Sequence, residues 1–415
     1  MITDNSIRKL NTAIFVSLCY VLISVGSINP TAEIGLVFGT LLAIFLTLIN
    51  SKAAFKSISK EHYILFTLLT VYVGIGILTY FTHEVTDRTL SKIGTSFHFI
   101  LIIFSIIVLS PSKSLKNIFW ISIILGAIIN FSAALYQSQY LGIRAHGGIN
   151  AILFGDISLL LGFMSVISYS YFKQFRFSAV FPLMGLISGI GASFLSQSRG
   201  GWIAIPFLLI VILATSYYQK KINMKQAVLS LMSSIAFILI VFYLSWDLFG
   251  SRIELAIHQF NSYFLPGNTN IHTSVGARLE IWKGAMLLIS DYPALGAGMG
   301  GWQDIFAIQV SEGRMLDTSL YTNIHNQILQ EGVNKGIIGI FSYLALNIYL
   351  FYYFLSKIKN SSNNHELHAI GLLLVVGYFI FGLTNVVFSH GTFNTFFVSM
   401  LALVFTLAKS DKHQA

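Results

Sequence analysis

The chain has 415 residues, of which 55% are hydrophobic and only 10% are charged, and its formal net charge is +9. Soluble domains carry about 25% charged residues, so this composition excludes a soluble globular protein and indicates an integral membrane protein. The positive charge is explained by membrane topology, as described below, and does not indicate a nucleic-acid partner.

Long apolar segments follow one another without the period-two alternation of barrel strands, which predicts membrane helices. We expect about twelve spans, each close to the ~20 residues that a bilayer core requires. They are Thr12–Ile28, Ile34–Ile49, Tyr63–Phe81, Ile93–Leu109, Ile118–Leu135, Ala151–Tyr171, Phe177–Leu195, Trp202–Tyr217, Ala227–Trp246, Ile337–Leu355, Leu367–Phe388 and Thr392–Leu407. The predicted fold class is an all-α integral membrane protein with a long helical external loop.

Lysine and arginine are unevenly distributed between the two sides of these spans. If the N-terminus is cytoplasmic, that side holds 16 of the 25 Lys and Arg residues and the external side holds the other nine. Cytoplasmic loops are enriched in these residues, so we expect both termini to be cytoplasmic.

The first span has no A-x-A-like cleavage site, which predicts an uncleaved helix. The predicted domains are 1–246 with spans one to nine, 247–336 as an external loop subdomain, and 337–415 with the last three spans and a cytoplasmic tail.

Two external loops before the long one carry arginine. QSQYLGIRAHGGIN (137–150) contains Arg144, and SQSRGG (196–201) places Arg199 where one span ends and the next begins. An arginine near the membrane usually faces a cavity or a partner, and its planar fork suits phosphate. Both are therefore candidate phosphate ligands; the alternative is an arginine that reaches the lipid headgroups or makes a structural ion pair. Asp156, in a predicted span, is a candidate proton-relay residue or a local polar partner.

The long external loop predicts two helices. RLEIWKGAMLLI (278–289) has apolar residues spaced three and four apart, the pattern of an amphipathic helix. NQILQEGVNKGIIG (326–339) predicts a helix that leads back into the membrane. LGAGMGGW (295–302) follows no strand, so it predicts a bend beside the membrane and not a nucleotide-binding loop.

Two residues of this loop are candidates for chemistry. Arg278, at the start of the amphipathic helix, is a second candidate phosphate ligand. His325 directly precedes the helix that re-enters the membrane, and an unperturbed histidine titrates near pH 6.5, so it can accept a proton at external pH. The alternative is an ordinary surface histidine, because His258, His272 and His390 are also external.

Several motifs are missing. The sequence contains no D-x-D, no H-E-x-x-H and no G-x-x-x-x-G-K-[ST]. The single cysteine, Cys19, excludes a disulfide within the chain and a cysteine-based metal site. The sequence therefore predicts no metal and no cofactor.

Taken together, the motifs resemble those of the O-antigen ligases. His325 and Asn326, the nine residues Gln327–Lys335, and then Gly336 and Gly339 match the ligase-type signature of His, Asn/Ser/Gln, nine residues and Gly-x-x-Gly. SQSRGG and SVGARL resemble the two arginine segments of the same superfamily, which also includes O-antigen polymerases and protein O-oligosaccharyltransferases. The likeness is specific over residues 196–206 and 274–340.

The resemblance implies a metal-independent, inverting membrane glycosyltransferase of the GT-C-like type. It implies transfer of O-antigen polysaccharide from undecaprenyl pyrophosphate to a sugar hydroxyl of lipid A-core, on the periplasmic face of a Gram-negative inner membrane. His325 falls on the catalytic position, and Arg199 and Arg278 fall on the positions that bind diphosphate. Further candidate substrate contacts are Arg144, Asn326, Tyr321 and His390. The oligomeric state is not predicted.

Two other functions remain open from the sequence. An O-antigen polymerase would use the same donor with a lipid-linked glycan as acceptor, and the full signature favours the ligase. A lipid-linked glycan transporter would suit twelve spans and Asp156, but the chain has no visible repeat and its polar residues concentrate on one external face. The sequence disfavours a protein O-oligosaccharyltransferase, because those proteins are typically longer, with an additional C-terminal region.

Overall fold

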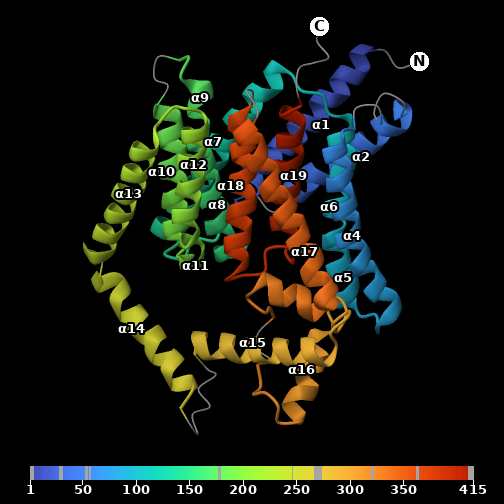
Figure 1. Ribbon diagram of the computed structural model, residues 1–415, viewed down its shortest axis with the longest axis vertical. Coiled ribbons are helices and arrows are strands. Elements are labelled where there is room, and N and C mark those ends of the chain that lie inside the picture. The colour runs from blue at the N-terminus through green and yellow to red at the C-terminus, as the bar shows by residue number, and fades with distance from the viewer. Residues whose placement is uncertain are drawn as a thin grey trace.

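The computed structural model describes residues 4–27, 31–51, 55, 58–175, 179–244, 246–265, 273–318, 322–360 and 364–409. Over these residues every regular element is a helix (Figure 1), which confirms the predicted all-α fold class. The elements are α1 (Asp4–Ser24), α2 (Thr31–Ile49), α4 (Lys60–Thr82), α5 (Asp87–Ser96), α6 (His98–Val108), α7 (Lys113–Leu135), the π-helix η1 (Tyr136–Tyr140), α8 (Ala151–Ile167), α9 (Tyr169–Phe172), α10 (Val180–Leu195), α11 (Arg199–Trp202), α12 (Ala204–Tyr218), α13 (Met224–Leu244), α14 (Trp246–Tyr263), α15 (Ser274–Asp291), α16 (Trp302–Ser311), α17 (Gln327–Asn360), α18 (His365–Gly382) and α19 (Gly391–Leu407).

Each predicted span corresponds to a helix or to two helices in succession. Within the described part of the chain, nine segments are long and apolar enough to cross a membrane, and α10 and α19 are shorter apolar helices. The remaining predicted span corresponds to α13. The chain is therefore an all-α integral membrane protein. The predicted spans agree with the helices in position, except that α18 ends at Gly382, six residues before the predicted end of its span at Phe388.

The helices α8 and α18 form the centre of the bundle, and most of each is buried against its neighbours. Small residues allow α8 to approach α10 closely, as is common between membrane helices. A Cβ atom added at Gly189 would lie 2.4 Å from the carbonyl oxygen of Ser158 and 2.5 Å from the Cα of Gly162. A larger residue at Gly189 would therefore force the two helices apart.

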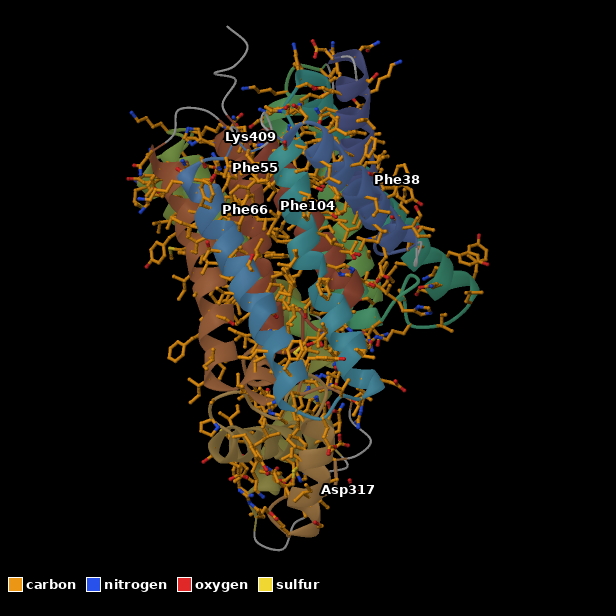
Figure 2. All side chains as sticks on the ribbon, turned by 90° about the vertical axis from the view of Figure 1, so that its right-hand side faces the viewer. Phe38, Phe55, Phe66, Phe104, Asp317 and Lys409 are labelled. Carbon is orange, nitrogen blue, oxygen red and sulfur yellow. The ribbon has the colours of Figure 1, made fainter. Side chains whose placement is uncertain are left out.

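A layer that includes α15 and α16 lies outside the bundle and covers one end of it (Figure 1), and it is called the external layer for this position. Helix α15 runs across the bundle axis and α16 lies against it, whereas α1 begins and α19 ends at the opposite end (Figure 1). Figure 2 shows Asp317 of the external layer and Lys409 at opposite ends of the molecule. The layer has its own apolar core, which includes Ile281 and Leu288 of α15, Trp302 and Phe306 of α16, and Ile324 and Val333. The buried positions of α15 recur every three or four residues, which confirms the predicted amphipathic helix.

Helix α17 is broken at Gly336, which the sequence did not predict. The backbone of Gly336 has φ 63° and ψ −160°, and a Cβ atom there would lie 2.2 Å from the carbonyl oxygen of Ala294. Residues 293–297 pack against α17 at this break. Ile337 N donates to Pro293 O (2.7 Å), and Ala297 N donates to Val333 O (2.8 Å). The predicted bend at 295–302 is confirmed, with positive φ at three of its glycines. The break lies at the predicted boundary between residues 336 and 337, and the domain division itself stays a prediction.

Candidate functional site

Three segments that are distant in the sequence meet where α18 ends, facing the external layer. A Cβ atom at Gly200 would lie 2.8 Å from the Oγ1 atom of Thr384, so α11 and the end of α18 are in close contact. From the other side, Asn326 Nδ2 donates a hydrogen bond of 3.4 Å to the carbonyl oxygen of Leu383. Arg199 precedes Gly200 and His325 precedes Asn326. Arg199 and His325 are therefore each next to a residue that contacts the end of α18, at Thr384 and Leu383 respectively.

The turn that carries Arg199 is held by a buried carboxylate. Ser198 Oγ donates to Asp156 Oδ1 (2.9 Å), and the Asp156 side chain is buried within α8. A Cβ atom at Gly201 would lie 2.0 Å from the same carboxylate oxygen, so the glycine is required for this approach. Of the two interpretations of Asp156, this geometry favours the local polar partner over a proton relay.

Arg144 closes the same turn from the neighbouring loop. Its Nε atom donates to the carbonyl oxygen of Ser196 (2.6 Å) and its Nη2 atom donates to that of Gln197 (3.4 Å). Burial and the nearby charge of Arg199 lower the pKa of the Arg144 guanidinium. The two guanidinium groups are therefore close enough for their charges to interact, and an anion bound beside them would offset this repulsion.

His325 has a left-handed backbone, with φ 55°. This conformation is uncommon for a residue other than glycine, and such residues concentrate at functional sites. The segment is fixed on both sides of the histidine. Trp282 Nε1 of α15 donates to the carbonyl oxygen of Ile324 (2.9 Å), and Asn326 Oδ1 accepts from Leu329 N (3.1 Å) and caps α17. These hydrogen bonds fix the backbone on both sides of His325, and the Asn326 side chain supplies one of them.

The surroundings of His325 favour its neutral form. Burial and, secondly, the positive charge of Arg278 lower its pKa below the ordinary value. Its Nδ1 atom is buried and has no hydrogen-bond partner among the residues that the structure describes. Burial and then the charges of Lys92 and His325 lower the pKa of His390 to about 4. At neutral pH both imidazoles are uncharged, so His325 can accept a proton.

Lys92 of α5 is a basic residue of this region that sequence reasoning missed as a site candidate. Its Nζ atom donates to the carbonyl oxygen of Ser389 (3.3 Å), next to His390. The sequence shows Lys92 only as one of the external basic residues, and no local pattern connects it with residue 390. The contact arises from the packing of α5 against α19.

A buried polar network supports the segment of α17 that follows His325. Gln327 Oε1 accepts from Phe388 N (2.9 Å), and Gln327 Nε2 donates to Glu331 Oε1 (2.6 Å). The network thus ties α17 to the segment between α18 and α19. Sequence reasoning did not single out either residue.

The network continues into a buried ion pair. Lys335 Nζ lies 2.7 Å from Glu331 Oε2 and 3.5 Å from the centre of the Tyr72 ring, and the Tyr72 hydroxyl donates to Glu331 Oε1 (2.6 Å). Lys335 belongs to the predicted external loop, and its side chain is only 1% exposed. The spacing of Glu331 and Lys335 by four residues was the available signal, since it suits an ion pair on one helix face.

The predicted site residues are therefore distributed as follows. Arg144 and Arg199 lie together at one side of the end of α18, whereas Arg278, His325 and His390 lie close enough for their charges to interact. Tyr321 lies outside the described residues. Across the described residues, no group of three or more His, Cys, Asp or Glu side chains is arranged to hold a metal ion. The arrangement offers a neutral base among cationic groups, which suits proton abstraction beside an anionic substrate.

Comparisons with known proteins point to one family. Residues 184–344 match the family described as O-antigen ligase. An uncharacterized protein of Haemophilus influenzae is 28% identical over 287 residues, which cover 66% of this chain and 69% of that protein. The O-antigen ligase of Escherichia coli K12 is 25% identical over 257 residues, which cover 60% of this chain but only 56% of the ligase. The family match over residues 184–344 contains Arg199, α15 and His325.

Proposed function

Because the chain belongs to the O-antigen ligase superfamily, we propose that it is an O-antigen ligase. In this function it transfers O-antigen polysaccharide from undecaprenyl pyrophosphate to a sugar hydroxyl of lipid A-core and so completes lipopolysaccharide. The observation that carries the proposal is the signature histidine, His325, fixed in a strained backbone and kept neutral by burial and by Arg278. The active site is then periplasmic, in the inner membrane, and both termini are cytoplasmic.

The residues suit direct displacement at an anomeric carbon. His325 accepts the proton of the acceptor hydroxyl as its oxygen attacks. Arg199 and Arg278 bind the diphosphate and stabilise the negative charge that develops on it as it leaves. A single displacement inverts the anomeric centre, as in inverting glycosidases. A diphosphate already is a good leaving group, so the proposed reaction requires neither ATP nor a metal ion.

A direct transfer assay tests this function. The purified protein is incubated with an undecaprenyl-pyrophosphate-linked glycan and lipid A-core, without added metal or ATP and with a chelator present. Appearance of glycan on lipid A-core is the expected result. Lengthening of the lipid-linked glycan, without transfer to lipid A-core, would show a polymerase instead and overturn the proposal.

The pH dependence of transfer is expected to report the effect of Arg278 on His325. Neutral His325 is the active form, so kcat/KM should be constant near neutral pH and fall only below the ordinary histidine pKa of about 6.5. Replacement of Arg278 by glutamine removes a positive charge, raises the pKa of His325 and moves the acid limb to higher pH. Arg199→Gln is the control. It also removes a positive charge, but that charge lowers the pKa of Arg144, whereas the charge that lowers the pKa of His325 is that of Arg278. An acid limb at the same pH in both variants would contradict the assignment.

Lysine substitutions test how the arginines act. Arg199→Lys and Arg278→Lys should each lower the rate on the order of 100-fold, nearly as much as alanine, because lysine lacks the planar fork that binds phosphate through two hydrogen bonds. Initial rates at saturating acceptor measure the effect. Full activity of the lysine variants would show that a positive charge is sufficient at these positions.

A further inference from the structure

The external layer contains a hollow that the proposed chemistry does not use. Its volume is about 540 Å³, within the range of small-molecule sites of about 300–1,000 Å³, and its lining comes from α16, the start of α5 and residues 317, 318 and 322. The apolar part of the wall is formed by Trp302, Phe306 and Val310. Trp302 and Phe306 are almost fully buried and pack edge to face, with ring centroids 5.0 Å apart. This part of the wall is therefore rigid and formed in advance.

The polar part of the wall includes three neutral hydrogen-bonding residues. Gln303, Thr318 and Thr322 line the hollow. The Oε1 atom of Gln303 is buried and has no hydrogen-bond partner in the described part of the chain. Buried polar atoms without a partner are uncommon and require an explanation, such as a ligand that donates a hydrogen bond. A ligand with hydroxyl groups would satisfy this acceptor.

The charges around the hollow disfavour an anionic ligand. Arg88 is the cationic residue among the lining residues, and its Nη2 atom donates to both carboxylate oxygens of Asp304 (2.8 and 3.0 Å). Asp317 adds a further carboxylate to the rim. An apolar wall beside neutral hydrogen-bonding groups suits a sugar ring, which has an apolar C–H face and hydroxyl groups at its edge. The same wall does not suit a phosphate group.

The hollow lies close to the candidate base. Thr322 precedes His325 by three residues, which span at most about 10 Å. Between them, Ile324 is buried in the same apolar cluster as Trp302 and Phe306. The wall of the hollow and the segment that carries His325 therefore belong to one packed unit.

We propose that this hollow is a saccharide subsite, which binds uncharged sugar residues adjacent to the bond that is formed. The proposal rests on the proposed function, because that function defines the two glycans that can supply the sugars. They are the donor polysaccharide near its reducing end and the core oligosaccharide of the acceptor. Binding here holds one glycan in register with His325 and so determines which sugar reacts.

Filling the hollow tests the proposal in the full-length protein. Ala307→Trp places a large side chain in the hollow, and Ile308→Trp is the matched control, since Ile308 is exposed on the same helix but is not part of the wall. We expect Ala307→Trp to raise KM for one glycan substrate about tenfold or more while kcat changes less. Gln303→Leu removes one hydrogen bond and should raise the same KM about three- to tenfold. An increase for the donor or for the acceptor identifies the source of the sugar.

A binding measurement separates this proposal from the proposed function. Saturation-transfer NMR is recorded with two probes that lack lipid and diphosphate, the released O-antigen oligosaccharide and the core oligosaccharide. We expect transfer of saturation to one probe, its loss in Ala307→Trp and its retention in Ile308→Trp. This result would support the subsite even if the transfer assay gave no lipid A-core product. Unchanged KM values together with no saturation of either probe would overturn the subsite and leave the ligase function untouched.

Discussion

Replacement of His325 by alanine should lower the rate of glycan transfer by about 100- to 10,000-fold, the usual contribution of a general base, while the protein still binds its donor. The acceptor hydroxyl would then lose its proton only to water. The neutral state of His325 and its fixed backbone are the structural reasons for this expectation. Initial rates with both substrates saturating measure the effect, and binding of the lipid-linked donor is measured separately.

Two variants control for loss of structure. Asparagine tolerates the left-handed backbone at this position better than most residues but cannot act as a base, so His325→Asn should be folded and as inactive as alanine. His258→Ala changes an exposed histidine of α14 and should be fully active. Thermal unfolding in detergent should be similar for all three proteins. Retained transfer in both His325 variants would exclude the general-base role.

The membrane fold was predictable because it follows from composition along the chain. Continuous apolar segments located the helices, and the spacing of Ile281, Ala285 and Leu288 located the helix that lies across the bundle. The break in α17 was not predictable in the same way. In the sequence, Gly336 is compatible with a continuous helix. The break arises because Pro293 and Ala294 pack against it, and this contact joins two segments that are about 40 residues apart in the sequence.

The candidate site was predictable only in part. Individual residues such as Arg199 and His325 stand out through motifs, but their approach to one another depends on how α11, α17 and α18 pack. The supporting residues were predictable only in part for a related reason. The sequence left two roles open for Asp156 and did not single out Lys335, and only the packed structure shows the specific partner of each. Polar residues that hold a site in place are identified by their neighbours, not by a motif.

The ion pair between Glu331 and Lys335 provides the second large effect. Lys335→Met should lower the free energy of unfolding by about 3–5 kcal/mol, because it leaves the buried Glu331 carboxylate without a counter-charge. Lys357→Met is the matched control. Lys357, also in α17, makes a partly exposed ion pair with Glu61 of α4, and such a pair is worth about 0–1 kcal/mol. Denaturation midpoints in the same detergent measure the difference between the two variants.

A double variant separates the loss of the pair from the unpaired charge. In Glu331→Gln/Lys335→Met both charges are removed, so the stability should recover relative to Lys335→Met alone. Transfer should not recover to the same extent if the Glu331 carboxylate is needed to hold Gln327, since Gln327 connects α17 to the segment that carries His390. Equal recovery of stability and transfer would mean that the pair contributes only to folding. Similar midpoints for Lys335→Met and Lys357→Met would show that the Glu331 carboxylate is accessible to water. The expectation that Glu331 and Gln327 hold α17 against the segment that carries His390 would then be contradicted as well.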